Sequence, residues 1–212
     1  MQLDIVSDYV CPWCYVGKRR LEKALEQRLN LDINVRWLPF QLSPDLPAEG
    51  INRLEYYVSI FGEQRAEQIV ASMSDTGKED GIDFQNKPDA VSPNTLLAHT
   101  LMELAQATEG ANTDLLAERL FHAHHVDCLN IGDPNVLAGI AEACGLDAAA
   151  VEGCVADAAA KGRVKETINE SVKRGVTGVP FFIFDERFGL SGAQPVDEFI
   201  ATLDKLASSE AG

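Results

Sequence analysis

The sequence predicts an α/β fold in which a small mixed sheet, built from both ends of the chain, carries a large all-helical insertion. Three observations lead to this fold class. Residues 2–38 have the pattern strand, helix, strand, residues 43–154 are mostly helical, and residues 181–206 have the pattern strand, strand, helix. Because the β-rich segments stand at the two ends of the chain, we expect them to meet in one sheet flanked by helices.

The first elements form a β-α-β unit. Residues 2–6 are predicted to form a strand, and residues 12–29 have helical periodicity. Ile33, Val35 and Trp37 then alternate with other residues in a second strand. This order favours a parallel pair of strands joined by a right-handed crossover.

The middle of the chain is expected to be helical. Three prolines within nine residues mark an irregular connection after residue 38. Helices are then expected over residues 54–61, 63–74 and 94–108, from residue 113 or 114, from residue 134, briefly after residue 147, and over about 155–174. Ser92-Pro93, Asp133-Pro134 and Asp147 are typical of helix starts, because each offers a capping side chain.

The last segment returns to β structure. Phe181-Phe182-Ile183-Phe184 is an apolar run of buried-strand length, and residues 188–191 complete a hairpin with it. Pro195 opens a final helix with an apolar stripe. We therefore expect one domain made of residues 1–42 and 155–212, and a helical insertion domain made of residues 43–154.

Composition argues against several classes of function. The 212 residues include 18 Lys and Arg against 33 Asp and Glu, a net charge of −15, which makes nucleic acid and anionic membranes poor partners. No apolar run approaches transmembrane length. Met1-Gln2 leads directly into the first strand without a signal peptide, and five cysteines is an odd number. We expect a cytoplasmic protein without a structural disulfide framework.

The most informative motif is Cys11-Pro12-Trp13-Cys14, where the first strand meets the first helix. Free backbone N–H groups at a helix N-terminus favour a thiolate at Cys11. Cys14 follows one turn later, where its sulfur can attack a mixed disulfide formed by Cys11. A structural zinc site would need four ligands, and the chain has no second C-x-x-C motif. If the two cysteines were only buried structural residues, their position at the junction of strand and helix would stay unexplained. A redox dithiol is therefore the better interpretation.

The other cysteines and the histidines give weaker signals. One predicted helix carries His122, His124, His125 and Cys128. No further ligand at suitable spacing completes a set of four, so we expect no metal there. Cys128, Cys144 and Cys154 are interpreted as buried thiols, and a second redox pair among them stays open.

Several stretches of the chain together resemble a known family. They are residues 7–18, Asn94-Thr95 with Ala98-His99, Asp133-Pro134, residues 177–180, and residues 191–195. With this element order they resemble a thioredoxin fold with a helical insertion. More narrowly, the chain is similar to DsbA-like oxidoreductases of the FrnE type, which are related to 2-hydroxychromene-2-carboxylate isomerases and kappa-class glutathione transferases.

The resemblance implies roles for the motif and for the loop before the third strand. Cys11 would attack, Cys14 would resolve, and Pro12 and Trp13 would tune the redox potential. The resemblance also implies that Pro180 is cis and lies against Cys11. The backbone of Val179 would then be open to an extended thiol substrate.

The resemblance also implies candidate ligand contacts. In glutathione-binding relatives the start of the last helix binds the γ-glutamyl carboxylate, so Ala193 and Gln194 are candidates, with simple helix capping as the alternative. His99 would either line the cleft above Cys11 or serve as a hydrogen-bonded core histidine.

Two departures from the family pattern matter. DsbA-like and thioredoxin-like proteins have a buried acid six residues before the first cysteine, where this chain has Ile5. Asp4 and Asp8 are the nearby candidates for the proton acceptor. The isomerase branch usually has Ser at the position of Cys11, and this chain has both cysteines, which favours dithiol chemistry.

We therefore predict a thiol–disulfide oxidoreductase acting on protein or small-molecule substrates, with glutathione as a candidate co-substrate and no other cofactor. The first alternative is a glutathione-dependent isomerase or transferase of the 2-hydroxychromene-2-carboxylate isomerase type. The second is a chaperone or binding module that uses the helical insertion. The oligomeric state, including a homodimer, stays open.

Overall fold

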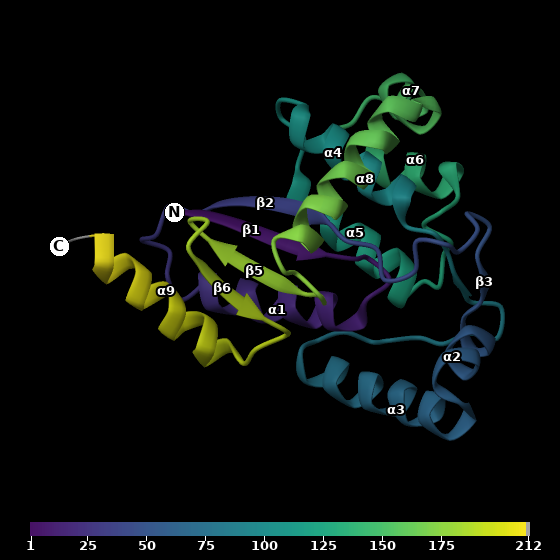
Figure 1. Cartoon of the computed structure of the whole chain (residues 1–212), viewed down its shortest axis with the longest axis horizontal. Coiled ribbons are helices and arrows are strands. Elements are labelled where there is room, and N and C mark those ends of the chain that lie inside the picture. Colours follow the sequence, from purple (N-terminus) through teal and green to yellow (C-terminus); the bar gives the residue numbers. More distant parts are fainter. Residues whose placement is uncertain (211–212) are drawn as a thin grey trace.

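The computed structural model describes residues 1–210 and contains a four-stranded mixed sheet in the order β2-β1-β5-β6 (Figure 1). Strand β1 (Gln2–Ser7) runs parallel to β2 (Asn34–Pro39) and antiparallel to β5 (Phe181–Phe184), which pairs with β6 (Phe188–Ser191). The predicted parallel pair and C-terminal hairpin are thus confirmed.

Helices cover both faces of this sheet (Figure 1). Helices α1 (Pro12–Leu25) and α9 (Val196–Glu210) pack together on one face, whereas α8 (Ala158–Lys173) covers the other near β2. The core between sheet and helices is aromatic, since the rings of Phe182 and Phe199 meet edge to face at 4.8 Å and both are fully buried.

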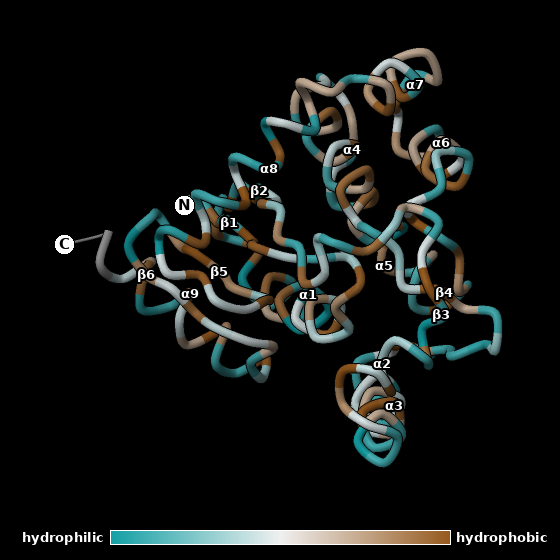
Figure 2. The backbone as a smooth tube through the Cα atoms, turned by 45° about the vertical axis from the view of Figure 1, so that its right-hand side comes forward, coloured by the Kyte–Doolittle hydropathy of each residue, from teal (hydrophilic) through white to brown (hydrophobic). Residues whose placement is uncertain are grey.

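The helices between β2 and β5 form two groups. Helices α4 (Leu96–Ala107), α5 (Thr113–His125), α6 (Pro134–Glu142) and α7 (Ala148–Ala156) pack against one another and, through α4, against α8. Helices α2 (Arg53–Phe61) and α3 (Glu63–Glu79) form a hairpin that stands apart from them in both views (Figures 1 and 2). None of the helices in residues 1–210 is long and apolar enough to cross a membrane.

Two of the predicted caps are confirmed. Asp133 Oδ1 accepts a hydrogen bond from the Asn135 backbone N–H at 2.8 Å, at the start of α6. Asp147 Oδ1 accepts one from the Ala149 N–H at 2.9 Å, at the start of α7. Each side chain satisfies an N–H group that the helix itself leaves without a partner.

Four details of the predicted secondary structure are wrong. Ser92 does not cap a helix, because it lies in strand β4 (Val91–Ser92), which pairs with β3 (Ile51–Asn52) in a second, two-stranded sheet. Helix α4 begins only at Leu96, whose N–H donates to Asn94 Oδ1. The first helix ends at Leu25 instead of residue 29. The helix expected from residue 155 begins at Ala158, because the Asp157 side chain caps it.

Candidate active site

Cys11 is the N-cap residue of α1, and its backbone is held on both sides. The Cys11 N–H donates to the Asp8 carbonyl at 3.0 Å, and the Cys11 carbonyl accepts from the Cys14 N–H at 3.1 Å. Pro12 follows at the first helical position, where no backbone N–H is needed. This turn places Cys11 at the N-terminus of α1, where backbone N–H groups favour negative charge.

The loop before β5 lies against Cys11. The Val179–Pro180 peptide bond is cis, and Cys11 Sγ lies 3.8 Å from the Val179 carbonyl oxygen. The Pro180 carbonyl in turn accepts from the Gly192 N–H at 2.8 Å. The structure thus brings the N-terminal motif and the segment 178–180 together, although they stand about 170 residues apart in the sequence.

Cys14 has a different environment from Cys11. Both cysteines are free thiols with little exposure, and Cys14 is only 2% exposed. Burial raises the pKa of Cys14 well above its ordinary value, and the neighbouring Cys11 sulfur adds to this increase. The Ser7 hydroxyl and the Asp8 backbone lower the same pKa by a smaller amount. At neutral pH the Cys14 thiol is therefore held in its protonated form.

A cavity of about 780 Å³ opens in front of Cys11. Val10, Cys11, Pro12 and Trp13 form one wall together with Gly178 and Val179. Residues of α2 and α3 form the opposite wall, and segments 42–46 and 92–93 complete it. This volume lies within the range of about 300–1,000 Å³ that is usual for small-molecule sites.

The segment at the start of the last helix does not line this cavity in the described structure. The Ala193 carbonyl accepts from Arg20 Nη1 at 2.8 Å, and the Gln194 side chain donates to the Ser191 carbonyl at 2.7 Å. The two candidate glutathione contacts therefore have partners within the protein. Ala193 still lies near Pro180, since both approach Gly17 of α1.

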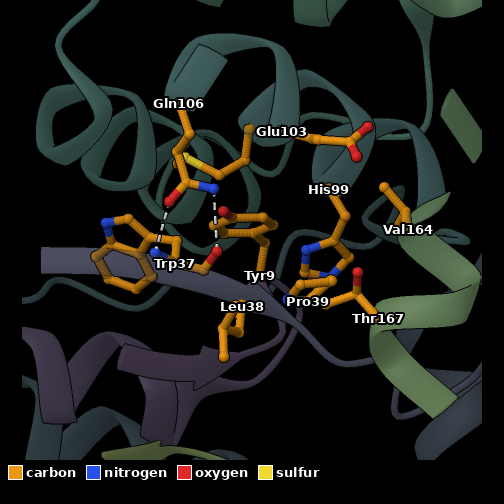
Figure 3. A pocket seen from close by; sticks show the side chains of 10 residues that line it. Tyr9, Trp37, Leu38, Pro39, His99, Glu103, Gln106, Val164 and Thr167 are labelled. Carbon is orange, nitrogen blue, oxygen red and sulfur yellow. Dashed lines mark hydrogen bonds between the residues drawn. The ribbon is translucent and has the colours of Figure 1, made fainter. Parts of the chain in front are cut away.

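His99 lies on α4 and lines a smaller cavity of about 110 Å³ instead of the one in front of Cys11 (Figure 3). Its ring is 4.9 Å from that of Tyr9, and its Nε2 atom is 3.4 Å from Asp8 Oδ1. Both side chains are almost completely buried, and neither atom has a hydrogen bond of good geometry within residues 1–210. In the same view, Gln106 bonds both backbone groups of Trp37 and closes one side of the cavity.

The two acids near Ile5 have different partners. Asp4 receives two hydrogen bonds from Arg36, at 2.9 and 2.5 Å. Asp8 is fully buried, and its second oxygen accepts from the Leu42 N–H at 2.8 Å. The pairing of Asp8 with His99 escaped sequence reasoning, because 91 residues separate them in the chain and no local pattern links α4 to the end of β1.

The histidines of α5 are mostly buried. Burial and the charge of Arg53 lower the pKa of His125 to about 3 and that of His124 well below its ordinary value. Arg53 donates to the His124 carbonyl at 2.8 Å. Among residues 1–210, no group of three or more His, Cys, Asp or Glu side chains is placed to hold a metal ion.

Comparisons with known proteins extend over nearly the whole chain. Residues 2–204 match the family model described as DSBA-like thioredoxin domain. The uncharacterized protein YwbO of Bacillus subtilis is 28% identical over 200 residues, which are 94% of each chain. A probable DsbA oxidoreductase from Streptomyces coelicolor has a similar structure, with a TM-score of 0.86 and 30% identity over 97% of this chain and 89% of its own.

Two more distant structures share the fold. The cytosolic disulfide reductase DsbM from Pseudomonas aeruginosa with GSH has a TM-score of 0.67 and 19% identity, over 98% of this chain and all of its own. A 2-hydroxychromene-2-carboxylate isomerase has a TM-score of 0.68 and 17% identity, over all of this chain and 98% of its own.

Proposed function

The chain belongs to the family of DSBA-like thioredoxin domains, and we propose that it is a thiol–disulfide oxidoreductase whose reactive pair is Cys11 and Cys14. One observation carries this proposal. Cys11 stands at the N-terminus of α1 and lines a cavity of about 780 Å³, whereas Cys14 is buried behind it as a protonated thiol. The two sulfurs are thus suited to different steps.

In the first step, the Cys11 thiolate attacks one sulfur of a substrate disulfide. A bond forms between Cys11 and that sulfur, and the other substrate sulfur leaves as a thiolate. In the second step, Cys14 loses its proton and attacks Cys11. The Cys11–Cys14 disulfide forms, and the second half of the substrate leaves as a reduced thiol. The same steps in reverse oxidise a dithiol, so the reduction potential decides the direction.

Residues next to the cysteines are given supporting roles in this proposal. Val179 presents its backbone to the substrate beside Cys11, which is supported by the 3.8 Å separation between Cys11 Sγ and its carbonyl oxygen. Pro180 holds that loop against α1. Pro12 and Trp13 adjust the reduction potential. The Trp13 side chain is also 39% exposed to solvent and lines the cavity, so its ring can contact a substrate there.

The proton of Cys14 needs an acceptor, and Asp8 is the group we assign to this role. Its backbone contacts both cysteines, and its Oδ1 atom, which has no hydrogen bond of good geometry within residues 1–210, lies 3.4 Å from Nε2 of the buried His99. Asp4 is less suitable, because Arg36 already engages both of its oxygens. A cytoplasmic site of action fits the five free cysteines, since reducing compartments keep thiols free.

Single-cysteine variants test the proposal. Cys14→Ser keeps the attacking sulfur and lacks the release step, so it should accumulate Cys11-linked mixed disulfides with proteins or glutathione. Cys11→Ser should accumulate none. Adducts are measured by intact mass and on non-reducing gels.

A glutathione-dependent isomerase would behave differently, because none of its steps needs Cys14. If Cys14→Ser turns over an aromatic isomerase substrate at the wild-type rate and traps no adduct, the oxidoreductase proposal is wrong and the isomerase is favoured. Activity that survives in the Cys11→Ser, Cys14→Ser double variant would instead point to a binding or chaperone function.

A further inference from the structure

The cavity in front of Cys11 has an unusual charge distribution for this protein. The whole chain carries a net charge of −15, yet the described lining includes no carboxylate and only one charged side chain, Arg65. The rest of the lining is aromatic, aliphatic or uncharged polar, for example Tyr57, Ile60 and Phe61 on α2. An anionic group that enters the cavity therefore meets attraction from its walls, and a cationic group meets no partner there.

Arg65 is placed to bind an anion. It is the third residue of α3, so the free N–H groups and the positive end of the helix dipole lie beside it. Glu63 in the same first turn is exposed and does not line the cavity. Within the described chain, Arg65 makes no ion pair or hydrogen bond that would occupy its guanidinium group. A guanidinium binds a carboxylate through two parallel hydrogen bonds.

The remaining walls favour apolar groups. Helix α2 exposes Ile60 and Phe61 by about half, and Trp13 on the opposite wall is also partly exposed. Aromatic and aliphatic surfaces of this kind bury the apolar part of a small ligand, while a few polar groups set its orientation. The cavity therefore combines three features on different walls: the Cys11 sulfur, an apolar surface and one cation.

We propose that this site is specific for small disulfides of aromatic or aliphatic thiol acids, in which an apolar group carries a single carboxylate that pairs with Arg65. This inference rests on the proposed function. Glutathione disulfide fits less well, because each half carries two carboxylates and an ammonium group, and the described walls offer the ammonium no carboxylate. The exchange itself is unchanged: Cys11 binds one thiol-acid half, and the other half leaves as a thiolate.

The test compares a charged and an uncharged aromatic disulfide on the Cys14→Ser protein. One is 5,5′-dithiobis(2-nitrobenzoate), which carries carboxylates, and the other is 4,4′-dithiodipyridine, which is uncharged at pH 7.5. Arg65→Gln should slow the reaction of Cys11 with the carboxylate probe about tenfold, the loss expected for a charge-assisted hydrogen bond. It should change the reaction with the neutral probe less than twofold. Stopped-flow absorbance follows the released thiol, and the Cys11→Ser, Cys14→Ser variant supplies the background of the other cysteines.

Arg174→Gln is the matched control, because it removes the same charge from an exposed position at the end of α8. Equal slowing of the carboxylate probe by both variants, or equal slowing of both probes by Arg65→Gln, would overturn the substrate class and leave the oxidoreductase proposal intact. So would a faster reaction of Cys11 with glutathione disulfide than with the carboxylate probe. If Cys11 reacts with neither aromatic probe, the proposed function itself fails.

Discussion

His125 shows how a single buried side chain sets a property of the whole protein. Its ring lies among Tyr15, Phe84 and Phe121, at centroid distances of 5.3 to 6.3 Å. Burial, aided by the nearby charge of Arg53, lowers the pKa of His125 from 6.5 to about 3. The folded protein therefore keeps this ring neutral under conditions in which the unfolded chain binds a proton.

This difference predicts a loss of stability in acid. Above pH 6.5 the ring is neutral in both states, so its contribution to the free energy of unfolding is complete. Below pH 6.5 the unfolded state gains protons and the folded state does not, so stability falls until the pH reaches about 3. Between pH 7 and pH 5 the loss from this residue should be about 2 kcal/mol.

Urea unfolding at pH 7 and pH 5 measures this loss. His125→Phe keeps an aromatic ring in the cluster and should reduce the difference between the two pH values by about 2 kcal/mol relative to wild type. His122→Gln is the control, since His122 is on the same helix and about half-exposed, and it should retain the wild-type difference. A full wild-type loss in His125→Phe would mean that other groups cause the acid sensitivity.

At the scale of elements, the contact between α1 and β5 places the reactive cysteine. Gly17 lies one turn beyond the cysteine motif and faces the loop before β5. A Cβ atom at this position would lie 3.1 Å from Pro180 Cγ and 3.2 Å from Phe182 Cζ. Both contacts are with rings held in the core, so neither can move aside easily.

Two glycine-to-alanine variants therefore should have opposite effects. Gly162→Ala in α8 meets no atom within 4 Å and should stabilise the protein by about 0.5–1 kcal/mol through helix propensity. Gly17→Ala gains the same propensity, but overpacking should outweigh it and leave a net loss of about 1 kcal/mol. Urea unfolding of both variants tests this, and equal stabilisation by the two would show that the α1–β5 contact has room for a methyl group.

The helix starts and strands of this fold were predictable where a local signal exists. Asp133 and Asp147 act as caps because each side chain accepts a hydrogen bond from a backbone N–H group only two residues later in the sequence. Ser92 carries the same signal and fails, because pairing with Ile51 in a distant segment holds it extended. Strands of two residues have no periodicity to detect, so the second sheet could not be predicted.

The candidate site likewise contains residues that the sequence identifies and residues that only tertiary packing brings together. Cys11 and Cys14 could be identified from the motif, and the nearness of Val179 and Pro180 to Cys11 was implied only by resemblance. The opposite wall of the cavity comes from α2 and α3, which the sequence presents only as helices. Their position depends on tertiary packing, as does the pairing of Asp8 with His99. No local pattern carries that information.

At the scale of the whole molecule, the cavity lies between the start of α1 with the loop before β5 and the α2–α3 hairpin. The hairpin packs mainly on itself and meets α1 through few contacts (Figures 1 and 2). Asp80 at the end of α3 attaches the hairpin to α1, because it accepts hydrogen bonds from Arg20 at 2.8 Å and Lys23 at 2.9 Å. The Asp80 side chain is almost fully buried, so removing its charge would leave two cations of α1 without their partner.

Asp80→Asn should therefore release the hairpin without unfolding the sheet. We expect amide hydrogen exchange in α2 and α3 to become at least tenfold faster, as for a local loss of about 1.4–3 kcal/mol, while exchange in β1 and β5 stays at the wild-type rate. Asp75→Asn on the same helix is the control, because its pair with Lys78 spans 3.7 Å between two exposed side chains and contributes little. Faster exchange throughout the chain in Asp80→Asn would show that hairpin and sheet unfold as one unit. Selective loosening would show instead that the wall carrying Arg65 can move independently of the wall carrying Cys11, so that a substrate could enter by displacing the hairpin alone.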